Sequence, residues 1–182
     1  MLREYAAQAR RWPVDTKCAE SVNRMASKSN KMPKITLRPA QPLDHDFAAG
    51  LYLESRKELL TTLGMWDEVR VKARFDKVFK PDQAQVIRSD GVDIGWMQIS
   101  EGDRGFHLHQ LYLVDRYRNR GIGRALVEAL QDRARGIGKP IALNVIRGNP
   151  AMSLYRRLGF RLVGEDEEKL HLRWSPDKPK AG

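Results

Sequence analysis

Residues 118–124 read Arg-Asn-Arg-Gly-Ile-Gly-Arg and carry the strongest structural signal in the chain. An apolar strand-like segment precedes them and an amphipathic helix pattern follows. Glycine lets the backbone turn tightly and approach a ligand closely. The free amides at a helix start lie at the positive end of the helix dipole and attract anions. With three arginines added, the stretch predicts an anion-binding turn between a strand and a helix, and pyrophosphate suits it best.

Two common phosphate-binding loops are excluded by spacing. The glycines do not follow the Gly-x-Gly-x-x-Gly pattern of dinucleotide-binding folds, and the turn does not follow the first strand of the chain. No Gly-Lys-Ser/Thr sequence follows either, which excludes a Walker loop.

The strand before this turn, expected over 106–114, has a break in its alternation. Phe106 and Leu108 share one face, but Leu111 falls out of phase with Leu108. A β-bulge near His109 and Gln110 produces such a slip, and bulges often redirect side chains beside active sites. A strand buried on both faces is the alternative.

The rest of the chain alternates strand and helix patterns. We expect strands at 35–39, 84–88, 93–100, 106–114, 140–145, 160–163 and 169–174. Helices are expected at 44–63, 67–79, 122–137 and 150–158, with Ile137 on the inner face of the third. The order strand-helix-helix-strand-strand-strand-helix-strand-helix-strand-strand predicts an α/β fold (α+β mixed), with a mixed sheet of about seven strands flanked by four helices.

Composition sets the outer limits. The chain has 182 residues, 31% of them charged, a formal net charge of +10 and one cysteine, Cys18. No apolar run approaches the roughly 18 residues that a membrane span needs. We expect one domain over 32–175, a basic extension over 1–31 that is non-native or a surface helix, and a disordered tail over 176–182. The lone cysteine suits a reducing compartment, so we expect a cytoplasmic protein.

A second motif follows the anion-binding turn. It reads Asn149-Pro150-Ala151, then Leu154-Tyr155, then Leu158-Gly159-Phe160. Together with Arg-x-x-Gly-x-Gly at 118–123, it resembles the GCN5-related N-acetyltransferase (GNAT) superfamily, from about residue 35 to residue 174. The resemblance implies a GNAT fold and an acetyltransferase that uses acetyl-CoA without a metal.

The resemblance also implies roles for particular residues. Main-chain groups before the turn would pair with the pantetheine arm of acetyl-CoA, and Asn149 would contact the same arm. Tyr155 would act as general acid toward the departing thiolate. The implied pantetheine and pyrophosphate contacts are Leu111, Tyr112, Leu113, Arg118, Asn119, Arg120, Gly121, Ile122, Gly123 and Arg124.

The general base has two candidates, because the expected strand 106–114 has no carboxylate. It carries His107 and His109 instead, and this His-x-His spacing resembles arylalkylamine N-acetyltransferases, in which two histidines conduct the amine proton away. Imidazole suits the task because its pKa lies near working pH. A water chain, with the histidines as surface or pairing residues, is the alternative. A zinc site is not expected, because His45 and His171 are scattered along the chain.

The acceptor should lie near the loop between the first two helices, where Trp66 and Trp96 are candidate contacts; Trp66 as a core anchor is the alternative. We expect direct acetyl transfer to a primary amine of a small molecule. A macromolecular acceptor (a protein N-terminus, a lysine or aminoacyl-tRNA) and a non-catalytic acyl-CoA-binding module are the alternatives. No membrane partner is expected. The sequence has no clustered basic stripe, so a nucleic-acid partner is not expected. Relatives are often dimers, which leaves a homodimer open.

Overall fold

The computed structural model describes residues 34–176. The expected extension over 1–31, with its surface helix, lies outside the described residues. So does the expected tail, apart from its first residue, Pro176.

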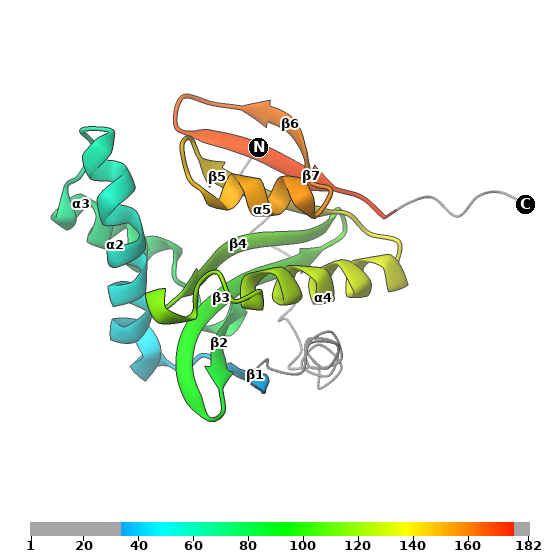
Figure 1. The fold of residues 1–182 in the computed structure, drawn as a ribbon, viewed down its shortest axis with the longest axis horizontal. Helices are drawn as coiled ribbons and strands as arrows, with labels where there is room; N and C mark the ends of the chain where they lie inside the picture. Colours follow the sequence, from blue (N-terminus) through cyan, green and yellow to red (C-terminus); the bar gives the residue numbers. More distant parts are fainter. Residues whose placement is uncertain (1–33, 177–182) are drawn as a thin grey trace, which may run out of the picture.

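The centre of the molecule is a seven-stranded mixed sheet (Figure 1). Every neighbouring pair is antiparallel except β4 and β5, which are parallel. The predicted element order, the meander of the three middle strands and the terminal hairpin are confirmed. In spatial order the strands are β1 (Ile35–Pro39), β2 (Ala84–Ser89), β3 (Val92–Gly102), β4 (Gly105–Leu113), β5 (Ile141–Ile146), β7 (Lys169–Trp174) and β6 (Arg161–Glu165).

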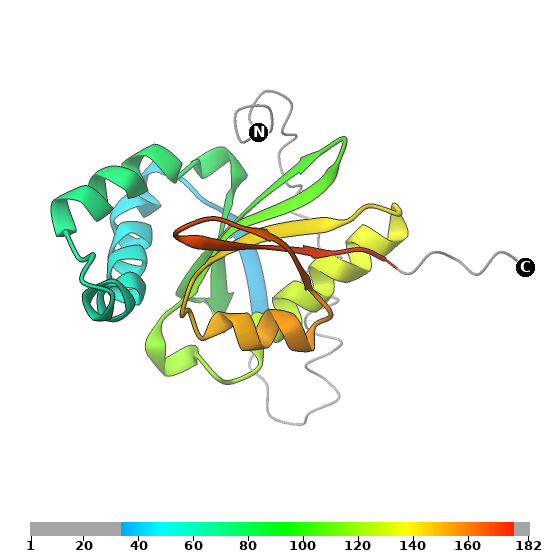
Figure 2. The same ribbon diagram turned by 90° about the horizontal axis from the view of Figure 1, so that it is seen from above.

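Helices cover both faces of the sheet. Helices α2 (His45–Thr62) and α3 (Glu68–Val78) pack on one face, against side chains such as Val86 and Trp96. Helices α4 (Ile122–Gly136) and α5 (Ala151–Arg157) pack on the other, against their strand neighbours Ile87 and Met97 (Figure 2). Successive strand residues point to opposite faces, which is why neighbours belong to different cores. Three short 3-10 turns link these elements: η1 (Pro42–Asp44), η2 (Pro81–Gln83) and η3 (Asp115–Tyr117).

The helix ends follow from local chemistry, with one correction. The carboxylate of Asp67 accepts the Arg70 amide and begins α3, at 2.9 Å. The inner face of α4 is buried as predicted, but Ile137 is 48% exposed. The prediction that Ile137 points inward is wrong because α4 ends at Gly136, before the helical repeat reaches it.

The predicted bulge in β4 is confirmed by its register with β3. Gln98 pairs with Gln110 and the next residue, Ile99, pairs with Leu108, so His109 is an extra residue in β4. This insertion returns Leu111 to the α4 and α5 face, where Leu108 also lies. The bulge therefore explains the break in the apolar alternation, because the extra residue puts Leu108 and Leu111 on the same face of the sheet.

The parallel ladder between β4 and β5 is short. Only Phe106, His107 and Leu108 pair with β5, opposite residues 141–143. Beyond Leu108, β4 continues to Leu113 and still pairs with β3, but it has no second partner strand among residues 34–176. The sheet thus opens at its centre, directly after the bulge.

Candidate active site

The unpaired half of β4 presents backbone groups to the opening. The amide of Val114 donates to the carbonyl of Ile94 at 2.9 Å, so the backbone N–H and C=O groups of Val114 point toward β3. Backbone direction alternates along an antiparallel strand, so Tyr112 also faces β3, opposite Trp96, whereas Leu111 and Leu113 face the opening. An extended amide-bearing ligand could pair there as an added strand. Of the three predicted backbone contacts, Leu111 and the amide of Leu113 point toward the opening, whereas the Leu113 carbonyl accepts from Arg118 and the backbone groups of Tyr112 point toward β3.

The predicted anion-binding turn follows β4 and leads into α4. Asn119 has φ +57° and Gly121 has φ +81°, so the chain passes twice through the left-handed region before the helix begins. After Arg118, the next backbone amide that donates to a backbone carbonyl is that of Ala125, which bonds to the Gly121 carbonyl at 2.9 Å. Within residues 34–176, the amides of 119–124 have no backbone acceptor. This run of free amides at a helix start is suited to a pyrophosphate.

The three arginines of the turn differ in their contacts and their exposure to solvent. The guanidinium of Arg118 points back into the protein: Nε donates to the Leu113 carbonyl at 2.9 Å and Nη2 donates to Ser55 Oγ at 2.6 Å. Its Nη1 lies 2.7 Å from Asp115. Arg118 therefore ties the turn to β4 and α2, and its side chain is already fully engaged. Arg120 and Arg124 are exposed, although Arg124 pairs with Glu128 at 2.8 Å.

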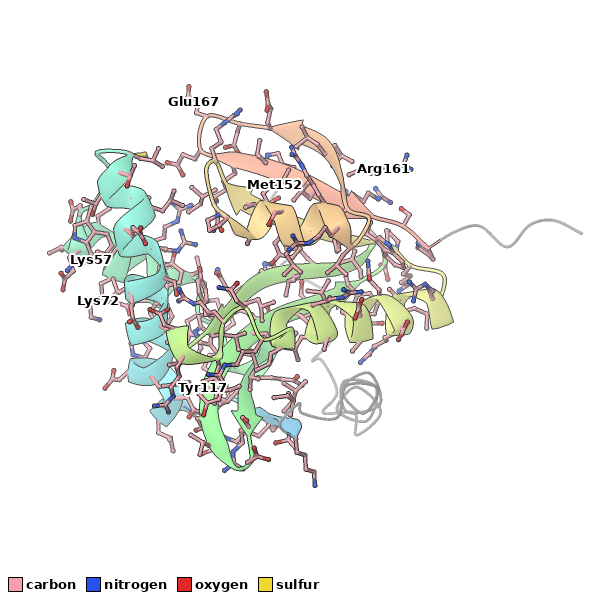
Figure 3. The ribbon with its side chains drawn as sticks, in the orientation of Figure 1. Lys57, Lys72, Tyr117, Met152, Arg161 and Glu167 are labelled. Atoms are coloured by element: carbon pink, nitrogen blue, oxygen red, sulfur yellow. The ribbon has the colours of Figure 1, made fainter. Side chains whose placement is uncertain are left out.

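Tyr155 of α5 and Asn149, which lies just before α5, come from the segment that follows β5; Figure 3 labels Met152 on α5 and Tyr117 of η3. The Oδ1 of Asn149 accepts the amide of Ala151 at 2.8 Å, which caps the start of α5 and leaves the Nδ2 group for a ligand. Tyr155 is 8% exposed. Burial, with a smaller effect of Tyr112, raises the pKa of Tyr155, so the hydroxyl stays protonated at neutral pH.

The predicted base residues lie together on the opposite face. The rings of His107 and His109 are 4.4 Å apart, and His109 Nε2 lies 2.8 Å from Ser100 Oγ. Burial, together with the neighbouring His109, His171 and Lys169, lowers the pKa of His107 to about 3. Burial lowers the pKa of His109 to about 4. Both imidazoles are therefore neutral at physiological pH and able to accept a proton.

His171 joins this group, although the sequence placed it among the scattered histidines. Its Nδ1 is 2.7 Å from Asn144 Oδ1 on β5, and its Nε2 is 3.1 Å from Asp166. The antiparallel pairing of β5 with β7, which sets Asn144 opposite His171, was the signal that could have found it. His45 lies elsewhere, bonded to Asp46 and Asp76. Residues 34–176 hold no set of three metal-binding side chains.

The two candidate tryptophans have different placements. Trp66 is half-buried against the α2 and α3 core, with the Lys57 ammonium 5.9 Å from its ring centroid. Trp96 is 0% exposed and sits among Phe75, Phe79 and Tyr112. Its burial leaves no surface for an acceptor to touch, so we assign Trp96 to the core.

Comparison with known proteins agrees with this geometry. The family model for the acetyltransferase (GNAT) domain matches residues 61–178. The chain is 32% identical over 118 residues to the L-methionine sulfoximine/L-methionine sulfone acetyltransferases of Pseudomonas paraeruginosa and Pseudomonas aeruginosa, over 57% of this chain and 69% of each relative. The chain therefore belongs to the GNAT family and is an N-acetyltransferase.

Solved structures show the same fold. The PaiA N-acetyltransferase from Thermoplasma acidophilum, in complex with coenzyme A, aligns with a TM-score of 0.64 at 18% identity, over 78% of this chain and 98% of that one. An acetyltransferase from Thermus thermophilus aligns at 0.59, also at 18% identity, over 78% and 96%. Among the described residues, no helix has the length and apolar character to cross a bilayer.

Proposed function

We propose that the protein transfers an acetyl group from acetyl-CoA directly to a primary amine of a small molecule. The observation that carries the cofactor assignment is the junction of two free backbone surfaces: the unpaired half of β4 and the run of free amides at 119–124. An amide-bearing arm ending in a pyrophosphate fits both. The curated relatives act on amino acid derivatives, which supports a small-molecule acceptor.

Acetyl-CoA, when bound, supplies the acetyl group as a thioester. Leu111 and Leu113 would pair with its arm, the amides of 119–124 would hold its phosphates, and Asn149 would donate through Nδ2. The backbone donors facing the opening can also polarise the thioester carbonyl. Because these groups are fixed by the sheet and by α4, they need little reorganisation during the reaction.

The proton balance uses both faces of the sheet. A neutral amine must attack, so His107 or His109 accepts the proton that the amine loses as the C–N bond forms. Tyr155 donates its hydroxyl proton toward the sulfur as the C–S bond breaks. The histidine then releases its proton to solvent, and the tyrosine regains one. The low pKa values keep both histidines unprotonated at neutral pH and favour release of the proton to solvent, but they also make each imidazole a weaker base than free imidazole.

The test is thiol release from acetyl-CoA with a panel of amines: amino acids, arylalkylamines, polyamines, aminoglycosides and short peptides. Mass spectrometry of the acceptor must show an added acetyl group on nitrogen. We expect turnover with at least one small-molecule class. Acetylation confined to peptides, or stabilisation by coenzyme A without turnover on any acceptor, would overturn the proposal in favour of a macromolecular acceptor or a binding module.

A further inference from the structure

Three cationic side chains gather on the α2 and α3 face, beside the unpaired half of β4. Arg56 of α2 donates through Nε to the Tyr112 hydroxyl at 3.2 Å, and its guanidinium lies 4.2 Å from the Tyr52 ring centroid. Arg74 of α3 reaches Glu168, at the start of β7, at 3.4 Å. Lys169 is the next residue, half-buried opposite Ile146 of β5. The three cations therefore come from α2, α3 and the first residue of β7, with Arg56 in contact with Tyr112.

These cations are poorly neutralised. Among residues 34–176, no carboxylate contacts the Lys169 ammonium or the Arg56 guanidinium, and the Arg74 contact with Glu168 is long, with both side chains more than 40% exposed. Two half-buried arginines elsewhere are well paired: Arg38 with Asp44 at 2.7 Å and Arg133 with Glu101 at 2.8 Å.

The pKa of Lys169 is lowered in part by the other two cations. Burial lowers the pKa of Lys169 first, and Arg74 and Arg56 lower it further against the opposing effect of Glu168 and Asp166. The negative groups nearby are otherwise engaged, because Asp166 already accepts the amides of Glu168 and Lys169 and contacts His171. Holding like charges together costs free energy that a bound anion would recover.

The same group lies next to the proposed chemistry. The Tyr112 hydroxyl, held by Arg56, donates to Gln110 at 3.0 Å, one residue after His109 in the bulge. Lys169 and His171 both affect His107. An acceptor whose amine approaches the histidines would therefore place a nearby substituent among the three cations. The α-carboxylate of an amino acid is one carbon away from its amine and has the required charge.

We propose that Arg56, Arg74 and Lys169 bind the carboxylate of the acceptor, which makes the enzyme selective for α-amino acids over neutral amines. This inference rests on the proposed function and specifies its substrate class. The arginines supply planar donors that match a carboxylate, and Lys169 adds a point charge.

The experiment compares matched acceptors on the full chain. Each amino acid of a panel that includes L-methionine sulfone is assayed beside its α-amide, which keeps the amine and side chain but removes the charge. The amine of the amide has the lower pKa, so a larger fraction of it is neutral and able to attack at neutral pH. A preference for the acid must therefore come from binding. We expect a kcat/KM for the acid at least tenfold above that of the amide, the size of effect typical of charge-assisted hydrogen bonds. Equal values for acid and amide would overturn the inference and leave the proposed function intact.

Variants locate the effect. Lys169→Met and Arg74→Gln should each raise KM for the acid about tenfold, whereas kcat/KM for the amide, which has no carboxylate to bind, should change far less. Lys169→Arg should restore most of the preference. Arg161→Gln, an exposed charge on β6 (Figure 3), is the control and should change neither value. Equal losses on acid and amide would show that these residues are only structural.

A binding measurement separates the two proposals if no amine is turned over. Titration of the acid and the amide into the protein saturated with coenzyme A should show tighter binding of the acid, lost in Lys169→Met. Tighter binding without turnover would support the anion site while the proposed function failed. Equal or absent binding would overturn the anion site.

Discussion

The two halves of β4 have similar apolar sequence but different surroundings. Residues 106–108 are held between β3 and β5, whereas residues 110–113 pair only with β3. The bulge at His109 separates them. Every proposed cofactor contact lies in or after the open half, and the closed half contributes only His107. The difference shows that the site is built by ending a ladder early, so that backbone groups normally used for folding are left for a ligand.

Adding a methyl group at Gly95 should break the open half most severely. A Cβ there would lie 2.2 Å from the Tyr112 carbonyl and 2.8 Å from the Leu113 side chain, so β4 must shift. We expect Gly95→Ala to lower the free energy of unfolding by about 3 kcal/mol, measured by urea denaturation. Gly102→Ala, on the same strand beside the closed half with nothing within 4 Å of its Cβ, is the control. Equal small losses in both variants would contradict the close approach.

Tyr155→Phe tests the α5 side of the opening. Removing a donor that acts only as the C–S bond breaks should lower kcat by about fiftyfold, or about 2 kcal/mol, with the Kd for coenzyme A unchanged. Tyr117→Phe, in η3 just before the turn, is the control and should retain kcat. Turnover in Tyr155→Phe equal to that of the wild type would remove Tyr155 from the mechanism.

The bulge itself is tested by His109→Gln, which can keep a hydrogen bond to Ser100 but cannot carry a proton. We expect kcat to fall about tenfold, because His107 can partly substitute. His45→Gln, on α2 and distant from the bulge, should leave kcat unchanged.

The same variant has a pH signature. His109 titrates at about 4 in the folded protein and near 6.5 when unfolded. The unfolded state therefore takes up the proton first, so stability is full above pH 6.5 and falls as pH drops from there toward 4. His107 behaves in the same way, and Lys169 and His171 add to the repulsion. His109→Gln should make this fall shallower in denaturant titrations; an unaltered slope would contradict burial of a neutral imidazole.

Arg118→Gln should have the smallest effect. It removes the links from the turn to Leu113 and Ser55, so the amides of 119–124 lose part of their alignment. We expect the Kd for coenzyme A to rise about fivefold, or about 1 kcal/mol, measured by calorimetry. Arg157→Gln, exposed at the end of α5, serves as the control. An unchanged Kd would show that the turn holds its shape without Arg118.

The fold was predictable because its signals are local. The spacing of apolar residues indicated the order of strands and helices, and the broken alternation of β4 indicated the bulge at His109. Ile137 was placed wrongly because periodicity does not show where a helix stops.

The site was less predictable where it depends on packing between distant segments. The inward turn of Arg118 toward Ser55 spans 63 positions, and the burial of Trp96 depends on two residues of the α3 region. The three cations Arg56, Arg74 and Lys169 come from three separate elements, far apart in the chain. No pattern within one segment encodes that meeting.

The ladder between β4 and β5 is the shortest in the sheet, so we expect the segment beyond it to behave partly as a separate cooperative unit. Residues 141–174 form β5, α5, β6 and β7, whose pairings are local in sequence, and three backbone pairs join them to the rest of the sheet. Parts of a protein with few connecting bonds can open without global unfolding. Amide hydrogen exchange in β5, β7 and β6 should therefore proceed as one group, faster than in β2 and β3. A ligand that contacts both sides of the opening would link the two units and slow that exchange.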